Sequence, residues 1–540
     1  MKTSAHDYAS LADAERAADA PPSAPMQPAP PAQALLRLPA CLARLSPRCR
    51  WALAALGAAA LALAVAAAVV FSQRRPPAPM AATLSAALSP QQPPQQLRNG
   101  VNRAPLCDSG ASVGALLPGL GVRLVRTHDA RALDWWVIFP DPTRDPEVAA
   151  NYDFSAGDAL FAAILAAGQE PYLRLGVSWP PGSPPVLPPV PQWSLAPDAA
   201  LFARVSVHTL AHYNDAAWAG GFTGKRIKYA EIWNEPDGKS PLMWAGSVQQ
   251  FYALFDATAR AIKLYDPGVK VGGPGVARVA DPDFGAGLVE FLVKAGTPFD
   301  FFSFHYYGSA ASRPLSVGST AAAVSAHLND AGLASVELHV TEWNTDALPR
   351  NTQRDSALAA AFVASALTEF VQSNVTLAAL YPACAGLGPS SWGIFEDVGD
   401  GSGAILWRRE THAYAALGQA LLEAPRALAG ASVPPNTDST IFAGASAQAP
   451  PLPGAGAALA YNVTAVVSTQ SPRFNGLALR VTDLPPAARV RLVAELVDEV
   501  HSSLDVVLDA AETADAAGAL TVSVGFTSPA VVRVRISPRG

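Results

Sequence analysis

The sequence predicts an α/β fold, a (β/α)8 TIM barrel followed by a C-terminal antiparallel β-sandwich domain. Through the middle of the chain, apolar β-branched runs alternate with helical runs rich in alanine and leucine, which is typical of successive βα units around a parallel sheet. Eight such runs fit within about 300 residues, the size of this barrel. After residue 425 the helical runs give way to short alternating runs separated by Pro, Gly, Asn and Ser, which favours a β-sandwich.

The expected barrel strands are short, and most are followed by a helical run. They are Val122–Thr127, Trp135–Phe139, Tyr172–Val177, Ile227–Trp233, Val269–Gly272, Phe299–Phe304, Val336–Thr341 and Val375–Tyr381. The expected helices include Ser155–Ala167, Ala199–Tyr213, Val248–Tyr265 and Asp355–Gln372. In the β domain we expect strands at Thr440–Phe442, Ala457–Tyr461, Leu477–Val481, Val490–Leu496, Leu520–Val524 and Val531–Ile536. We therefore expect the barrel to occupy residues 105–425 and the sandwich residues 426–540.

The first 104 residues lack the barrel pattern. Residues 1–50 are rich in Ala, Pro and Ser, which indicates a disordered tail. Residues 51–71 carry no charge and, at about 1.5 Å per residue, are long enough to cross a hydrocarbon layer of about 30 Å. A cleaved signal peptide is the alternative, but its apolar region is usually only about 7–15 residues long and its leader is much shorter. Residues 72–104 are rich in Pro and Gln and are expected to form a stalk.

Basic residues set the expected orientation of this span. Arg37, Arg44, Arg48 and Arg50 precede it and only Arg74 and Arg75 follow it, so we expect a single-pass type II membrane protein with a cytoplasmic N-terminus. The folded part would then be extracellular or in the ER or Golgi lumen. There the sequons at Asn374 and Asn462 could be glycosylated. The net charge of −6 and the absence of a basic run interleaved with aromatic residues argue against nucleic acid as a partner.

Two glutamates stand out at strand ends. Glu235 follows the expected fourth strand in AEIWNEPD, and Glu342 closes the seventh in HVTEWN. The active site of this barrel lies at the carboxyl ends of its strands, and a carboxylate is expensive to bury unless chemistry or pairing requires it. Two such groups are what retaining glycoside hydrolysis needs, with Glu235 as general acid and base and Glu342 as nucleophile, their carboxyl groups about 5–5.5 Å apart. No metal or organic cofactor is then expected.

Further residues reach the same face. His128 ends the expected first strand and His305 the sixth, and Asn234 could bond a substrate hydroxyl. By contrast, His208 and His212 have zinc-like spacing on a helix but lack the glutamate of a zinc protease, so helix packing is favoured over a metal site.

The chain resembles glycoside hydrolase family 39, the β-xylosidase and α-L-iduronidase family. The matching stretches are VRLVRTHDA, NYDFSAGDALFAAILAAGQEPYLRLG, AEIWNEPDG, VKVGGPG, FDFFSFHYYG and HVTEWN. The resemblance implies a (β/α)8 hydrolase of O-glycosyl compounds, EC 3.2.1.-, acting on a β-xyloside-like oligosaccharide or glycoside. It also implies sugar contacts from His128, Asn234, His305 and Tyr307, and a stacking wall at Trp392. The membrane anchor, the stalk and a proline-rich insert at residues 180–191 depart from the family.

Three alternatives stay open. The sugar could be a uronide or a mannoside, although a uronide needs a fixed cation and near Tyr307 only Arg313 offers one, which favours a neutral sugar. The protein could also be a catalytically silent carbohydrate-binding barrel, although such a module has no reason to keep both glutamates.

We also expect Cys107 and Cys384 to form a disulfide if the barrel is lumenal. One precedes the expected first strand and the other follows the eighth, so they should be neighbours where the barrel closes.

Overall fold

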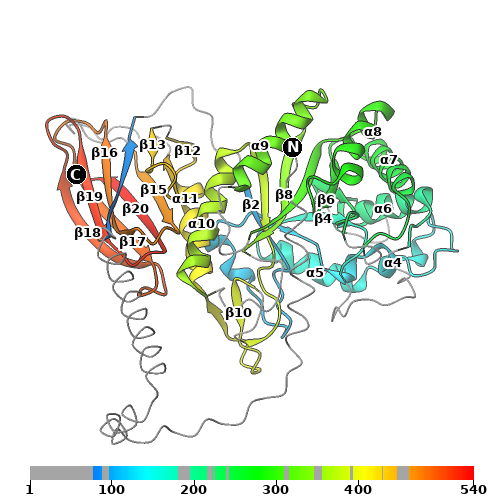
Figure 1. Ribbon diagram of the computed structural model, residues 1–540. Coiled ribbons are helices and arrows are strands. Elements are labelled where there is room, and N and C mark those ends of the chain that lie inside the picture. Colours follow the sequence, from blue (N-terminus) through cyan, green and yellow to red (C-terminus); the bar gives the residue numbers. More distant parts are fainter. Residues whose placement is uncertain are drawn as a thin grey trace, which may run out of the picture. The chain divides into compact units, whose positions relative to one another are not determined.

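The computed structural model describes residues 77–87, 97–179, 195–215, 222, 226–238, 243–308, 316–345, 355–388, 393–428, 430–446 and 461–539 (Figure 1). The expected tail, the expected membrane span, the proline-rich insert, Arg313 and Trp392 lie outside these residues. Among the residues that are described, the structure contains no helix of the length and apolar character needed to span a bilayer.

Eight parallel strands close into a barrel, as predicted. They are β2 (Arg98–Asn102), β3 (Leu124–Arg126), β4 (Glu170–Leu175), β5 (Tyr229–Ile232), β6 (Lys270–Val276), β7 (Phe301–Tyr307), β8 (Glu337–Asn344) and β9 (Val375–Leu380). The ring closes where β9 pairs with β2, so that Arg98 lies opposite Leu377. The carboxyl ends of all eight strands therefore lie at one rim.

The order of the first two barrel strands differs from the prediction. The first strand is β2, inside the expected stalk, and the expected strand Trp135–Phe139 is instead mostly the short helix α4 (Trp135–Ile138). Parallel neighbours need a crossover of about a dozen residues or more, and residues 127–134 are too few to connect β3 to another parallel strand. The two errors cancel in the count: Glu235 still follows the fourth strand and Glu342 still lies on the seventh, whereas His128 follows the second strand rather than the first.

Helices cover the outside of the barrel (Figure 1). The longer ones are α5 (Ser155–Ala166), α6 (Ala199–Asn214), α7 (Val248–Tyr265), α8 (Leu288–Ala295), α9 (Ser316–Asp330), α10 (Ala357–Gln372) and α11 (Arg409–Glu423). Helix α7 begins with a capping box, in which Ser247 and Gln250 satisfy each other's backbone amides. Its buried face carries Phe251, Leu254 and Phe255, at the spacing that turns one stripe of a helix toward the strands.

Side chains alternate between the inside and the outside of the barrel. On β3, Leu124 belongs to the small interior cluster, Val125 packs in a larger cluster that includes residues of the surrounding helices, and Arg126 is again fully buried. This period of two is inherent in a strand. The interior cluster of Leu124, Tyr172, Tyr229, Phe301, Leu377 and Ala379 fills the barrel's centre, and Arg126 lies one layer nearer the active rim.

The β domain consists of two sheets. One has the order β13-β1-β16-β19 and the other the order β12-β14-β15-β20-β17-β18. The strands are β1 (Ala78–Ser85), β12 (Arg426–Ala427), β13 (Ala431–Ser432), β14 (Ser439–Ala445), β15 (Val463–Thr469), β16 (Phe474–Thr482), β17 (Arg489–Val497), β18 (Asp505–Thr513), β19 (Leu520–Gly525) and β20 (Ala530–Pro538). One apolar cluster draws on both sheets. Strands β12, β13, β15 and β18 were not expected, and most of the expected strand Ala457–Tyr461 lies outside the described residues.

The expectation of a stalk over residues 72–104 is wrong for Ala78–Ser85. These residues form β1, which pairs in parallel with β16 and antiparallel with β13. The burial of Met80, Ala82 and Leu84 in the domain core explains why this segment is ordered, since alternate residues of a strand face the same side. The sandwich is therefore completed by a strand from before the barrel and is not purely antiparallel.

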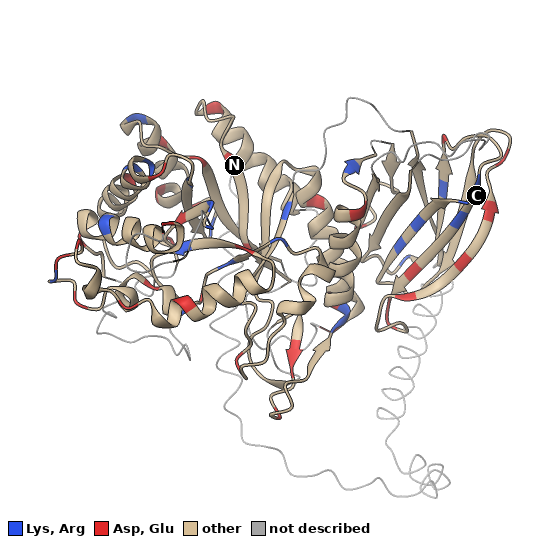
Figure 2. Cartoon of the chain, turned by 180° about the vertical axis from the view of Figure 1, so that it is seen from behind, with Lys and Arg blue, Asp and Glu red and all other residues tan. Residues whose placement is uncertain are grey.

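The β domain and the barrel's last helices are joined by polar contacts. Ser365 on α10 lies 2.7 Å from Ser468 on β15, hydroxyl to hydroxyl, and Arg533 on β20 donates to Glu495 and to Gln419 of α11. Figure 2 shows basic and acidic residues interspersed along the strands of this domain. Arg533 on β20 and Glu495 on β17 lie opposite each other and form an ion pair. Opposite charges on neighbouring strands stabilise their pairing.

Candidate active site

Glu235 lies in a strained turn just after β5. Trp233 and Glu235 both have positive φ, 77° and 45°, a conformation that is uncommon for residues other than glycine. Hydrogen bonds hold the turn, since Glu235 N donates to Gly275 O at 3.0 Å and Gly238 N donates to Glu235 O at 2.8 Å. Strain that is held in this way is concentrated at functional sites.

Glu342 lies on β8 and is 3% exposed. Arg126 Nη1 donates to its Oε1 at 2.8 Å, and the Tyr307 hydroxyl donates to its Oε2 at 2.7 Å. Both oxygens are therefore engaged and the carboxyl plane is fixed.

The two glutamates lie close together, with His305 between them. An oxygen of Glu235 and an oxygen of Glu342 lie within 4.8 Å of each other. His305 Nδ1 is 2.6 Å from Glu235 Oε1 and its Nε2 is 3.5 Å from Glu342 Oε1. The structure thus brings together Glu235 from the turn after β5, His305 from β7 and Glu342 from β8.

Arg126 joins several of these groups and was not anticipated from the sequence. Its Nε donates to Glu231 at 2.6 Å and its Nη2 to Asn234 Oδ1 at 2.7 Å, in addition to the bond with Glu342. Arg126 and Glu231 have fully buried side chains. The sequence did contain a signal for it. Arg126 stands two residues after Leu124 in LVR, and residues two apart on a strand face the same side, here the inside of the barrel.

Each remaining predicted sugar contact that falls within the described residues also lies at this site. His128 is buried, with Nε2 3.3 Å from Glu342 Oε1, and neither of its ring nitrogens has a hydrogen-bond partner in the described part of the chain. Asn234 Nδ2 is likewise buried without a partner there. Buried polar groups are normally hydrogen-bonded in folded proteins, so these nitrogens are candidates to bond a ligand.

The two carboxyl groups have different electrostatic environments. Burial, together with the nearby Asp237 carboxylate, raises the pKa of Glu235 to about 8. Burial also raises the pKa of Glu342, but His305, Arg126 and the Tyr307 hydroxyl act in the opposite direction. Because the guanidinium bonds Glu342 and not Glu235, protonation is favoured at Glu235. Burial and Arg126 lower the pKa of His128, and burial lowers that of His305, so both imidazoles are neutral near pH 7.

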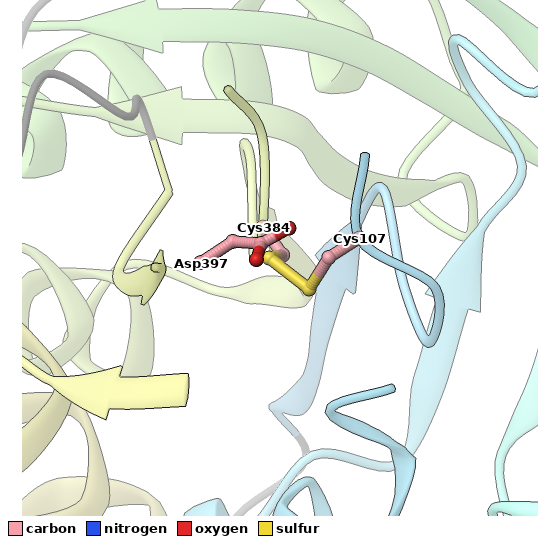
Figure 3. Close-up of side chains that lie close together, drawn as sticks. All are labelled: Cys107, Cys384 and Asp397. Atoms are coloured by element: carbon pink, nitrogen blue, oxygen red, sulfur yellow. A yellow bond between two sulfur atoms is a disulfide. The ribbon is translucent and has the colours of Figure 1, made fainter. Parts of the chain in front are cut away.

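Figure 3 shows the expected disulfide between Cys107 and Cys384, with Asp397 beside it. The two Cα atoms are 5.2 Å apart. Cys107 follows β2 and Cys384 follows β9, the strands that close the barrel, so the bond joins two loops at the active rim. The prediction of this bond is confirmed, although Cys107 follows the first strand instead of preceding it.

Two groups of side chains in the described residues have the spacing of metal ligands. In one, Cys107 and Cys384 with Asp397, the sulfurs are already bonded to each other. In the other, Glu235, His305 and Glu342, the Arg126 guanidinium bonds Glu342 and would repel a cation. The two helical histidines contact separate carboxylates instead, His208 with Glu147 at 3.1 Å and His212 with Asp158 at 2.7 Å.

Comparison with known proteins agrees with this geometry. Residues 224–383, which include both glutamates, match the family described as glycosyl hydrolases family 39. The chain is 27% identical over 274 residues to a β-xylosidase of Geobacillus stearothermophilus, covering 46% of this chain and 52% of that protein. It is 26% identical over 271 residues to a β-xylosidase of Caldicellulosiruptor saccharolyticus, covering 47% and 52%. The matched region thus spans about half the length of these curated relatives.

Solved structures share the fold over most of the chain. A glucosidase from Croceicoccus marinus has a TM-score of 0.69 at 21% identity, covering 86% of this chain and 100% of that one. A monomeric β-xylosidase from Caulobacter crescentus CB15 has a TM-score of 0.65 at 18% identity, covering 85% and 100%. A GH39 enzyme from Xanthomonas axonopodis pv. citri has a TM-score of 0.62 at 19% identity, covering 86% and 98%.

Proposed function

We propose, from the premise that residues 224–383 belong to glycosyl hydrolases family 39, that this protein hydrolyses an O-glycosidic bond with retention of anomeric configuration. The observation that carries the proposal is the approach of Glu235 and Glu342 to within 4.8 Å, oxygen to oxygen. Retaining enzymes place their carboxyl groups about 5–5.5 Å apart, whereas inverting enzymes leave about 6.5–9.5 Å for a water molecule. The short separation supports direct attack by one carboxylate.

In the first step, an oxygen of Glu342 bonds to the anomeric carbon as the bond to the leaving oxygen breaks. Glu235 gives its proton to that leaving oxygen. In the second step, a water molecule attacks the same carbon and gives its proton to Glu235, and the ester bond to Glu342 breaks. The pKa of Glu235, raised to about 8 by burial, suits a group that must be protonated near neutral pH before it can act as an acid.

Arg126 and Tyr307 support the nucleophile. Each donates to one oxygen of Glu342, and donors of this kind favour the ionised carboxylate. Asn234 and His128 offer buried nitrogens without partners in the described part of the chain, and sugar hydroxyls would satisfy them. Trp392, outside the described residues, remains a proposed stacking wall.

We infer a neutral, β-xyloside-like sugar as the substrate. Both curated relatives named above are β-xylosidases. A uronide substrate would need a free cation near its carboxylate. Arg103, on the loop after β2, already donates to Asp108 at 2.6 Å, so its charge is partly neutralised and it would serve a sugar carboxylate poorly. This favours a neutral sugar over a uronide such as an iduronide.

We also propose that residues 51–71 anchor the enzyme as a type II membrane protein with its catalytic part lumenal or extracellular. The Cys107–Cys384 disulfide supports an oxidising compartment. Carbonate extraction should leave the full chain in the membrane pellet. Release of a chain that begins after residue 71 would instead indicate a cleaved signal peptide.

The catalytic proposal is tested with a panel of aryl β-xylosides, glucosides, mannosides and α-L-iduronides. Proton NMR of the first product formed from a β-glycoside should show the β-anomer before mutarotation. First appearance of the α-anomer would contradict retention. If no glycoside is hydrolysed but sugars still bind, the protein is a silent carbohydrate-binding barrel.

A further inference from the structure

Asp129, directly after His128, has a left-handed backbone conformation. Its φ is 55°, in the left-handed region that glycine adopts most readily. Its side chain is only 8% exposed, and the neighbouring His128, whose pKa is lowered by burial and by Arg126, does not neutralise its charge near pH 7. A buried carboxylate on a strained backbone is costly, so its contacts need an explanation.

The Asp129 carboxylate joins three loops at the active rim. Its Oδ2 accepts a hydrogen bond from the Tyr381 hydroxyl, on the loop after β9. Its Oδ1 accepts one from the Trp179 backbone amide at 2.9 Å, on the loop after β4. The same Oδ1 lies 3.3 Å from His128 Nε2, on the loop after β3 that carries Asp129 itself.

Each of these three partners lies beside Glu235, beside Glu342, or beside a residue that contacts one of them. His128 Nε2 lies 3.3 Å from Glu342 Oε1, and the His128 and Tyr381 rings are 6.0 Å apart between centroids. The Trp179 side chain makes a hydrogen bond that favours the ionised form of Glu235. Asp129 therefore contacts neither glutamate directly, but one of its neighbours, His128, lies beside Glu342 and another, Trp179, bonds Glu235.

We propose that Asp129 is a positioning residue for the sugar-binding subsite, holding Tyr381 and Trp179 beside His128 around the bond that is cleaved. The inference rests on the proposed function, since it specifies how the same site is assembled. A carboxylate has acceptor positions on both oxygens, so one side chain can hold two loops at once. Glycine would suit the backbone better but could hold neither loop.

Two single variants and their combination test this role. Asp129→Asn keeps the size of the side chain and tolerates positive φ, but it removes the charge and one of the two acceptors. Tyr381→Phe removes the same hydrogen bond from the other side with little change of shape. We expect each to lower kcat/KM about 10- to 100-fold, as befits loss of a hydrogen bond to a charged group.

Asp483 provides a matched control in the β domain. It also has a positive φ, 60°, and its carboxylate accepts from two hydroxyls, those of Ser85 at 2.6 Å and Thr482 at 3.0 Å. Asp483→Asn should leave kcat/KM within about twofold of the natural enzyme, as expected of a distant surface change.

Three readouts separate positioning from a structural role. The double variant should lose less than the product of the two single losses, because both remove one interaction. The loss at Asp129→Asn should be the same for good and poor leaving groups, since Asp129 does not donate the leaving-group proton. Variants that merely unfold would lower the melting temperature, and kcat/KM per folded molecule would not fall.

If Asp129→Asn and Tyr381→Phe both keep kcat/KM within about twofold of the natural enzyme, the proposal is wrong. If the natural enzyme hydrolyses no glycoside, the proposed function fails. The positioning role of Asp129 is then tested by amide hydrogen exchange alone. Exchange at the Trp179 amide and in the loop after Tyr381 should then be faster in Asp129→Asn than in Asp483→Asn. Unchanged exchange would overturn the inference.

Discussion

His305 Nδ1 lies 2.6 Å from Glu235 Oε1. The same imidazole has its Nε2 3.5 Å from Glu342 Oε1, so one ring lies between the two carboxyl groups. Burial and Asp237 raise the pKa of Glu235 to about 8, and burial lowers that of His305. Near neutral pH Glu235 is therefore protonated and His305 is neutral, as an acid catalyst requires of Glu235.

The first prediction concerns pH. Because the pKa of Glu235 is raised above its ordinary value, the acid keeps its proton over a wider range, and kcat/KM should fall as pH rises through about 8. Glu235→Gln, measured with an activated aryl glycoside that needs no protonation, should lose this alkaline limb. An alkaline limb that persists in Glu235→Gln would assign it to another group.

The two glutamates should respond oppositely to chemical rescue. Glu342→Gly should abolish turnover and regain it with added azide, giving a glycosyl azide of inverted configuration, because the anion attacks in place of the missing carboxylate. Glu235→Ala should slow substrates with poor leaving groups far more than activated ones. Product analysis by NMR and a series of leaving groups check both roles, and equal losses across that series would deny Glu235 its role as acid.

Arg126 should matter for stability and for catalysis separately. Arg126→Gln leaves Glu231 buried without its ion-pair partner, which should lower the free energy of unfolding by about 3–5 kcal/mol. Adding Glu231→Gln should recover much of that loss but not activity, because Glu342 still lacks its donor. Urea unfolding and kcat/KM of the natural protein and of the two variants give the measurement, and activity that returns with stability would contradict a role at Glu342.

Strand β1 should be needed for folding of the β domain. A chain that begins at Leu97 loses Met80, Ala82 and Leu84 from the core, together with the pairing to β16. Removing large buried apolar side chains costs about 2–5 kcal/mol each, so this chain should be insoluble or melt well below one that begins at Pro77. Equal melting temperatures in calorimetry would show that β1 is dispensable.

The disulfide should stabilise the closure of the barrel. Cys107 and Cys384 are separated by 277 residues, and a bond that closes so long a loop restricts the unfolded chain strongly. Replacing both cysteines by serine should cost about 2–5 kcal/mol of unfolding free energy. Thermal unfolding with and without reductant checks this, and the serine variant should be insensitive to reductant.

Much of the site could be predicted from sequence because its signals are local. Glu235 and Glu342 each end an apolar strand-forming run, and a parallel barrel brings such ends to one rim whatever the details of the loops. This is why the miscounted strand Trp135–Phe139 did not disturb the result. The pairing of Cys107 with Cys384 followed in the same way, from the adjacency of the first and last strands.

What the tertiary structure decided depends on contacts between distant segments. Residues 78–85 read as part of a proline-rich stalk, and only pairing with β16, nearly 400 residues later, makes them a strand. Local composition does not predict the contacts of two buried charged residues. Arg126 bonds Glu231, Asn234 and Glu342, and Asp129 bonds Trp179 and Tyr381. The sequence by itself determined which residues end the strands, since period and propensity are local properties. Which partners each buried charge receives was decided by the closed barrel, because desolvation and hydrogen bonding depend on everything that surrounds the group.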